Sequence, residues 1–204
     1  RSTVAEWVGA QNETLLPGVQ VIMELTRPLE HTHVYFQPDI FAGYGWLFPK
    51  AGQANVGLGL KRLPQDKESI NRVLERFVDR LKQQGVICGE PLGYAAGWIP
   101  AEAVKKAVYG NIALVGDAAG HTHAVTGAGI FAAVLGGKMA GKWAARAVDA
   151  DNIDLLKEYN SEWQDLMADT LGRAHERRQY MESNWDDFQT TIEKCWVAYR
   201  AYYE

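Results

Sequence analysis

Apolar residues at every second position are the feature that most constrains how this chain can fold. They recur in four stretches between residues 19 and 60, which are separated at Pro28, at Pro38 and at residues 51–52. Because side chains alternate between the two faces of a strand, this period predicts four β-strands, each with one buried face, joined as an antiparallel sheet. The alternating residues are Val19, Val21, Met23 and Leu25, then Val34 and Phe36, then Tyr44, Trp46 and Phe48, then Ala54, Val56, Leu58 and Leu60.

A helix is predicted directly after these strands. Asp66 is a suitable N-cap, the apolar residues from Ile70 to Leu81 keep a spacing of three and four, and Gly85 provides the end. We expect this helix to cover one face of the sheet. The following residues, 86–99, are predicted to form two extended pieces interrupted by glycines.

The chain changes character after residue 108. Residues 112–115 are a continuous apolar run, which is typical of a strand buried on both faces. Residues 126–148 are predicted to be helical, and their glycines would each cost about 1 kcal/mol relative to alanine in an exposed helix, so we expect a close neighbour there. Lys138, Lys142 and Arg146 recur every fourth residue and give this helix one wet face, which argues against a membrane span.

Composition excludes several classes of protein. With 204 residues, 47% hydrophobic and 23% charged, the chain has the profile of a globular protein. A net charge of -4, without a cluster of Lys and Arg interleaved with aromatic residues, argues against a nucleic-acid partner. Cys88 and Cys195 lie far apart with no metal-binding spacing, which suits reduced thiols in a cytosolic protein, and no signal peptide is recognisable.

Residues 116–120, Gly-Asp-Ala-Ala-Gly, follow the predicted strand directly. Gly116 allows a turn that other residues resist, and Asp117 then stands at the carboxyl end of the strand, where it can accept hydrogen bonds from sugar-like hydroxyls. Residues 126–129, Thr-Gly-Ala-Gly, precede a helix whose free amides can face an anion, such as the N1 and O2 edge of a reduced flavin. On spacing alone, an ordinary tight connection between strand and helix is an alternative.

Two segments together resemble one known family. Residues 114–120 followed by 126–130 resemble the second FAD-binding motif of the geranylgeranyl reductases, which belong to the aromatic-hydroxylase-like flavoproteins. Residues 44–49, Tyr-Gly-Trp-Leu-Phe-Pro, resemble the family's Y-x-W-x-F-P segment, which in those reductases lines the channel for the isoprenoid chain. Ala124 and Ala128 depart from the pattern, because many relatives have proline and glutamate there.

The resemblance implies an FAD-dependent oxidoreductase that reduces isoprenoid double bonds of a lipid or pigment precursor with electrons from NAD(P)H or a ferredoxin-like donor. Family members begin with a G-x-G-x-x-G unit for the ADP half of FAD, which this sequence lacks, so we expect a C-terminal portion that is inactive by itself and binds FAD weakly. The residues implied to contact FAD are Gly116, Asp117, Ala118, Gly120, Thr126, Gly127, Ala128, Gly129 and Ile130. The residues implied to contact the substrate are Tyr44, Trp46, Phe48 and Pro49.

The predicted fold is α+β and has three parts. Residues 1–108 are expected to form a substrate-binding domain with an antiparallel sheet and its covering helix. Residues 109–150 are expected to supply the strand, loop and helix of an FAD-binding domain. Residues 151–204 are expected to form two long amphipathic helices, because their apolar residues keep a helical spacing.

His121 and His123 are the candidate catalytic residues, because a histidine in the flavin loop could supply a proton near flavin N5. Loop hydrogen bonding is the plainer role for both. The H-x-H pattern also occurs in metal sites, but no acidic or thiol residues are spaced to complete one, so no metal is expected.

Two other functions stay open at this stage. One is an FAD-dependent monooxygenase acting on an aromatic or polyene substrate, since it would share the fold and the Gly-Asp motif. The other is a non-catalytic module that binds lipid or a partner protein. A cytoplasmic location is expected, and peripheral contact with a membrane through the aromatic-rich residues 185–203, or self-association through an apolar patch, is left open.

Overall fold

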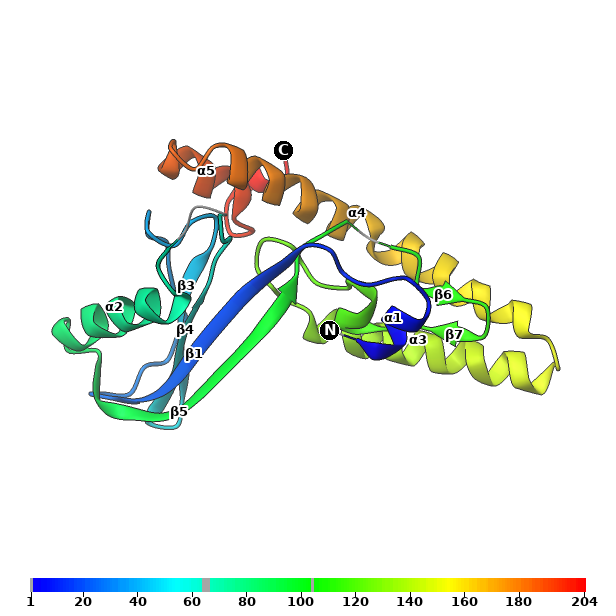
Figure 1. The fold of residues 1–204 in the computed structure, drawn as a ribbon, viewed down its shortest axis with the longest axis horizontal. Helices are drawn as coiled ribbons and strands as arrows, with labels where there is room; N and C mark the ends of the chain where they lie inside the picture. The colour runs from blue at the N-terminus through cyan, green and yellow to red at the C-terminus, as the bar shows by residue number, and fades with distance from the viewer. Residues whose placement is uncertain (1, 64–66, 104) are drawn as a thin grey trace. The chain divides into compact units, whose positions relative to one another are not determined.

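The computed structural model describes residues 2–63, 67–103 and 105–204 (Figure 1). The chain divides into two compact units, each of which is described by itself. Unit 1 comprises Arg1–Leu15, Ile99–Tyr180 and Glu193–Glu204, and unit 2 comprises Leu16–Trp98 and Met181–Ile192. The division predicted from the sequence, with boundaries at residues 108 and 150, stays a prediction.

Unit 2 is built on a five-stranded sheet with the strand order β2-β3-β4-β1-β5. The pairs β1 with β4, β2 with β3, and β3 with β4 are antiparallel, which confirms the predicted antiparallel sheet and the α+β fold. The strands are β1 (Leu15–Leu25), β2 (His33–Tyr35), β3 (Tyr44–Lys50), β4 (Gln53–Gly59) and β5 (Ile87–Pro100).

One face of this sheet packs against helix α2 (Ile70–Gln83), as Figure 1 shows. The alternation predicted from the sequence holds for β1 and β4, because Met23 pairs with Ala54 and both are buried in the core. In β2 and β3 the residues that reach the core are Tyr35 and Leu47, so the predicted apolar sets of these two strands do not form the core face. Gly45 lies under the ring of Phe77, and a Cβ there would be only 2.8 Å from the ring. The core residues are Val19, Val21, Met23, Leu47, Val56 and Leu58 of the strands and Val73, Leu74, Phe77, Val78 and Leu81 of the helix.

The ends of α2 and the course of β5 differ from the prediction. Ser69 is the N-cap of α2, and its Oγ accepts a hydrogen bond from the amide of Arg72, whereas the predicted cap, Asp66, lies outside the described residues. The two predicted extended pieces form one 14-residue strand, β5. The chain continues through Gly89 with a φ of 71°, which glycine adopts without strain.

In unit 1, a short hairpin leads into the motif. Strands β6 (Val108–Tyr109) and β7 (Ile112–Ala113) pair around a turn at Gly110. The prediction of a strand buried on both faces at residues 112–115 is wrong. In the described part of the chain β7 pairs only with β6, and both residues of β7 are half-buried.

Helix α3 (Ile130–Asp149) begins four residues later than predicted. The chain forms a loop before it, in which Gly127 has a φ of 68°. The expected close neighbour exists at Gly136, where a Cβ would be 3.1 Å from Val115, but no described atom lies within 4 Å of a Cβ at Gly137 or Gly141. The three basic residues of the predicted wet face, Lys138, Lys142 and Arg146, are exposed.

The C-terminal region contains one long helix and one short one, rather than two long helices. After the 3-10 turn η2 (Ile153–Leu156), α4 (Lys157–Ser183) has 27 residues, whereas α5 (Phe188–Cys195) has eight. A turn separates them, in which the Asn184 carbonyl accepts hydrogen bonds from the amide of Asp187 and the hydroxyl of Thr191.

The remaining elements are short. They are α1 (Thr3–Trp7) and the 3-10 turns η1 (Gly116–Ala119) and η3 (Arg200–Tyr202). Among the helices of the described residues, none has the length and apolar character needed to cross a membrane.

Candidate functional site

The Gly-Asp-Ala-Ala-Gly motif forms a tight turn that contains η1. Gly116 and Gly120 have φ values of 61° and 70°, in the left-handed region that favours glycine. The His121 amide donates to the Gly116 carbonyl at 3.0 Å and closes the turn. A Cβ at Gly116 would lie 3.1 Å from Ala133 of α3, so glycine also allows the turn and the helix to approach each other. The sequence predicted this turn correctly.

Asp117 is fixed by two contacts within this unit. Its Oδ1 accepts a hydrogen bond from the Thr122 hydroxyl at 3.0 Å, and its backbone carbonyl accepts one from Asn12 Nδ2 at 2.6 Å. The residue remains exposed, so its carboxylate can accept further hydrogen bonds. Asn12 was missed by the sequence analysis, because 105 residues separate it from Asp117 and no local pattern marks it.

The second motif lies directly beside the first. A Cβ at Gly129 would be 3.4 Å from Asp117 Oδ1 and 3.3 Å from Thr122 Oγ1. Gly129 is also the N-cap of α3, and no side chain caps this helix end. The first amides of α3 therefore begin next to the Asp117 carboxylate, and such uncapped amides can bind an anionic or electron-rich group.

The loop before α3 is held by its own backbone and by His123. The His123 amide donates to the Ala128 carbonyl at 2.9 Å, and the Gly127 amide donates to the His123 carbonyl at 2.8 Å. The Thr126 amide donates to His123 Nδ1 at 3.2 Å, and the Thr126 hydroxyl accepts from the Ala128 amide at 3.3 Å. At the end of this loop, Ile130 leaves 86% of its surface exposed.

The two candidate catalytic histidines have different surroundings. His121 has no exposed surface, and its ring stacks on Trp163 with centroids 3.7 Å apart. Neither of its ring nitrogens has a hydrogen-bond partner among the described residues, and burial lowers its pKa to about 4. His123 is half-buried, its Nε2 lies 2.9 Å from the hydroxyl of Tyr202, and burial lowers its pKa as well. Both histidines are therefore neutral at pH 7, and their catalytic role stays a prediction.

In unit 2, the three aromatic residues of β3 form a continuous row, which we call the aromatic row (Tyr44, Trp46 and Phe48). Ring centroids are 5.8 Å apart between the first two and 6.1 Å apart between the last two. The row lies on the sheet face opposite to α2, since its neighbours in β3, Gly45 and Leu47, belong to the core face.

The aromatic row is supported by the neighbouring strands. The Trp46 indole donates to Gln20 Oε1 at 3.2 Å, and a Cβ at Gly57 would be 2.6 Å from the indole, so glycine lets the ring lie flat across β4. Burial raises the pKa of Tyr44 to about 12, which keeps its hydroxyl protonated. Phe48 remains 38% exposed. The row thus offers an apolar surface without charge.

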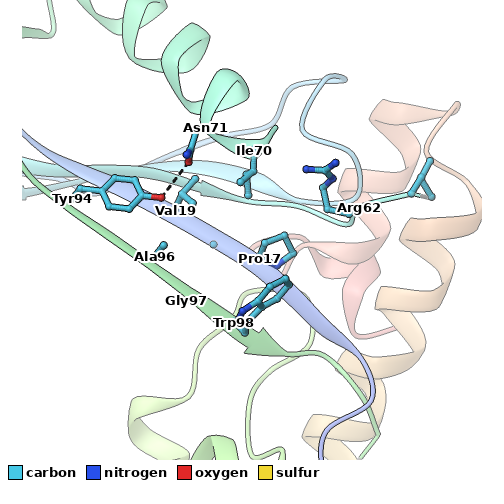
Figure 2. Close-up of a pocket in the computed structure, with 11 residues that line it drawn as sticks. Pro17, Val19, Arg62, Ile70, Asn71, Tyr94, Ala96, Gly97 and Trp98 are labelled. Carbon is cyan, nitrogen blue, oxygen red and sulfur yellow. Dashed lines mark hydrogen bonds between the residues drawn. The ribbon is translucent and has the colours of Figure 1, made fainter. Parts of the chain in front are cut away.

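A cavity of about 580 Å³ lies on the other side of the same sheet (Figure 2). Tyr94 of β5 and Asn71 of α2 close one end through a hydrogen bond of 3.1 Å, and Trp98 stands beside Pro17. Since Val19, one of its lining residues, belongs to the core face, the cavity is separate from the aromatic row. No expectation from the sequence covered this cavity, although the large aromatic residues Tyr94 and Trp98 of β5, which line it, were a signal.

A family model and several curated proteins match this chain. The family model of the geranylgeranyl reductase catalytic domain matches residues 17–90. Digeranylgeranylglycerophospholipid reductase 2 of Methanopyrus kandleri is 33% identical over 150 residues, which are 70% of this chain and 38% of that protein. Digeranylgeranylglycerophospholipid reductase of Methanococcus aeolicus is 34% identical over 181 residues, which are 82% of this chain and 46% of that protein.

Solved structures show the same fold. A geranylgeranyl bacteriochlorophyll reductase-like protein of Thermoplasma acidophilum has a TM-score of 0.78 at 23% identity, over 89% of this chain and 46% of that one. PqsL of Pseudomonas aeruginosa, described as a probable FAD-dependent monooxygenase, has a TM-score of 0.63 at 15% identity, over 94% of this chain and 56% of that one.

The family model and the curated relatives, together with the shared fold, define a chain of the FAD-dependent oxidoreductase class. Within that class it belongs to the geranylgeranyl reductase family, as its two motifs predicted. It spans less than half of the length of the two curated relatives described above.

Proposed function

We propose that the protein containing this chain reduces isoprenoid double bonds of a lipid precursor with electrons that pass through FAD. Membership of the geranylgeranyl reductase family and the names of the curated relatives support this proposal. A single structural observation carries it. Gly129, at the uncapped start of α3, lies so close to Asp117 that a Cβ on this glycine would contact the carboxylate.

The residues at this place fit FAD. The Asp117 carboxylate would accept hydrogen bonds from ribityl hydroxyls, and the first amides of α3 would face the N1 and O2 edge of the ring. The absence of a side chain at Gly129 leaves space beside the carboxylate, because a Cβ there would already contact Thr122 Oγ1 and Asp117 Oδ1. When bound, FAD supplies the hydride for the reduction.

The aromatic row is proposed to hold the isoprenoid chain. Its rings present a surface without charge to an apolar tail, and each buried CH₂ group would contribute about 0.8 kcal/mol. Pro49, the fourth residue predicted to contact the substrate, lies on the other face of the sheet, because it alternates with Leu47 and pairs with the core residue Ala54. The buried Tyr44 hydroxyl stays protonated near neutral pH, so this residue adds no negative charge against the chain.

Reduction of an alkene also needs a proton, and His121 and His123 are the proposed carriers. The geometry favours His123. It is half-buried and hydrogen-bonded to the Tyr202 hydroxyl, whereas His121 has no exposed surface and stacks on Trp163. NAD(P)H or a ferredoxin-like protein is proposed as the electron donor, and peripheral contact with a membrane as the way to reach a lipid.

The test is anaerobic turnover by the intact protein. Reduced protein is mixed with a digeranylgeranyl glycerophospholipid without oxygen, and mass spectrometry then counts the hydrogens gained by the lipid. We expect two hydrogens for each double bond reduced. A protein that retains FAD but leaves the lipid unchanged until oxygen is admitted, and then inserts oxygen, would be a monooxygenase. A protein that binds the lipid without flavin would be a non-catalytic module.

A further inference from the structure

His123 makes hydrogen bonds through all four of its polar groups. Its backbone amide, its carbonyl and its Nδ1 bond to Ala128, Gly127 and Thr126 within the same loop. Its fourth group, Nε2, leaves the loop and reaches the hydroxyl of Tyr202 at 2.9 Å, 79 residues further along the chain. This is the polar contact through which His123 joins the loop to the C-terminal segment.

The proton on this histidine can be placed from its partners. Nδ1 accepts a hydrogen bond from the Thr126 amide, so in the neutral ring it carries no hydrogen. The ring hydrogen is therefore on Nε2, which donates to the Tyr202 hydroxyl oxygen. The Thr126 amide, which can only donate, therefore sets this tautomer, and the Tyr202 hydroxyl, by accepting from Nε2, holds the ring in the orientation that keeps Nδ1 on the Thr126 amide.

The C-terminal segment that carries Tyr202 is itself fixed to α4. Arg177 donates from Nε to the Tyr202 carbonyl at 3.1 Å and from Nη2 to the Ala201 carbonyl at 3.2 Å. The thiol of Cys195 donates in turn to the Arg177 carbonyl at 3.2 Å. Only 3% of the surface of Tyr202 is exposed, so its hydroxyl is held in place rather than free to rotate through solvent.

We propose that Tyr202 is a positioning residue for residues 123–129, the loop that leads into α3. Its hydroxyl holds the His123 ring in place, Nδ1 of that ring accepts from the Thr126 amide, and the loop thereby keeps Gly129 beside Asp117. This inference rests on the proposed function, because that loop is proposed to face the flavin. The C-terminal segment is therefore a part of the flavin site that does not itself touch the flavin.

Tyr202→Phe tests the proposal, because it removes the hydroxyl and keeps the ring. The matched control is Tyr203→Phe, since Tyr203 is 58% exposed and its hydroxyl donates to the Val197 carbonyl, away from the loop. In the full chain, amide hydrogen exchange is measured at Thr126. We expect exchange about fivefold faster in Tyr202→Phe, the effect of losing roughly one net hydrogen bond.

A second variant weakens the contact between Tyr202 and His123 indirectly, through Arg177. Arg177→Lys keeps the charge but loses the paired donors that hold the Ala201 and Tyr202 carbonyls, so Thr126 exchange should rise in it as well. Far-UV circular dichroism that matches the wild type shows that each variant is folded. Unchanged exchange at Thr126 in folded Tyr202→Phe would overturn the proposal.

FAD titration of the intact protein separates this inference from the proposed function. We expect Tyr202→Phe to raise the dissociation constant for FAD about fivefold and Tyr203→Phe to leave it unchanged. Faster exchange with unaltered FAD affinity would refute the positioning role. Faster exchange in a protein whose wild type binds no FAD would support the loop contact and overturn the proposed function instead.

Discussion

Lowering the pH from 7 to 5 is expected to destabilise the fold through His121. Burial lowers the pKa of this residue from 6.5 to about 4 in the folded chain, and its ring stacks on Trp163 with no hydrogen-bond partner for either nitrogen among the described residues. Between these two pKa values, His121 is therefore protonated in the unfolded chain and mostly unprotonated in the folded chain. The free energy of unfolding is therefore unaffected by His121 above about pH 6.5, and it decreases as the pH falls from 6.5 toward 4.

The size of the effect follows from the shift. Each unit of pKa corresponds to about 1.4 kcal/mol, and about 1.5 units lie between pH 6.5 and pH 5, so His121 should account for about 2 kcal/mol of lost stability at pH 5. Burial lowers the pKa of His123 too, which adds a loss in the same direction.

Urea denaturation at pH 7 and at pH 5, followed by tryptophan fluorescence, measures this loss. His121→Phe keeps an aromatic ring against Trp163 but cannot be protonated, so we expect it to lose about 2 kcal/mol less than the wild type between the two pH values. His31→Gln is the control, because His31 is exposed. The reasoning would be refuted by a His121→Phe variant that loses as much stability on acidification as the wild type.

Three further substitutions test the two faces of the sheet. Phe77→Ala removes the fully buried ring between α2 and the sheet and should cost about 3–5 kcal/mol in urea denaturation; a loss below about 1 kcal/mol would contradict the packing. Gly45→Ala places a methyl 2.8 Å from the same ring and should cost about 1–3 kcal/mol, measured in the same way, unless the ring moves aside. Trp46→Ala should raise the KM of the intact protein for the lipid about tenfold with FAD affinity unchanged, whereas Trp98→Ala, on the other face, should leave KM unaltered.

The sheet could be predicted because its information is local. The period-two alternation in β1 and β4 identifies the face that packs in the core, whereas in β3 the alternating residues Tyr44, Trp46 and Phe48 lie on the other face and Leu47 packs in the core. The two glycine motifs were also recognisable, because Gly116, Gly120 and Gly127 adopt positive φ values that only a few residues tolerate.

Features set by distant contacts could not be predicted. Asn12 reaches Asp117 across 105 residues and Tyr202 reaches His123 across 79, and neither contact leaves a local pattern. The shortness of α5 depends on the turn at Asn184, and the helical spacing of the apolar residues gives no sign of this turn. The burial of His121 against Trp163 likewise arises from tertiary packing, so its low pKa has no signature in the sequence.

FAD titration of the intact protein with and without the Asp117 carboxylate tests the central claim most directly. Asp117→Ala removes the proposed ribityl acceptor and should raise the FAD dissociation constant about 10- to 100-fold, the range expected for a hydrogen bond to a charged group. The matched control is Asp79→Ala, an exposed carboxylate on α2. We predict loss of affinity in the first variant and none in the second. Equal FAD affinity in Asp117→Ala, Asp79→Ala and the wild type would contradict the proposal that this motif faces the flavin.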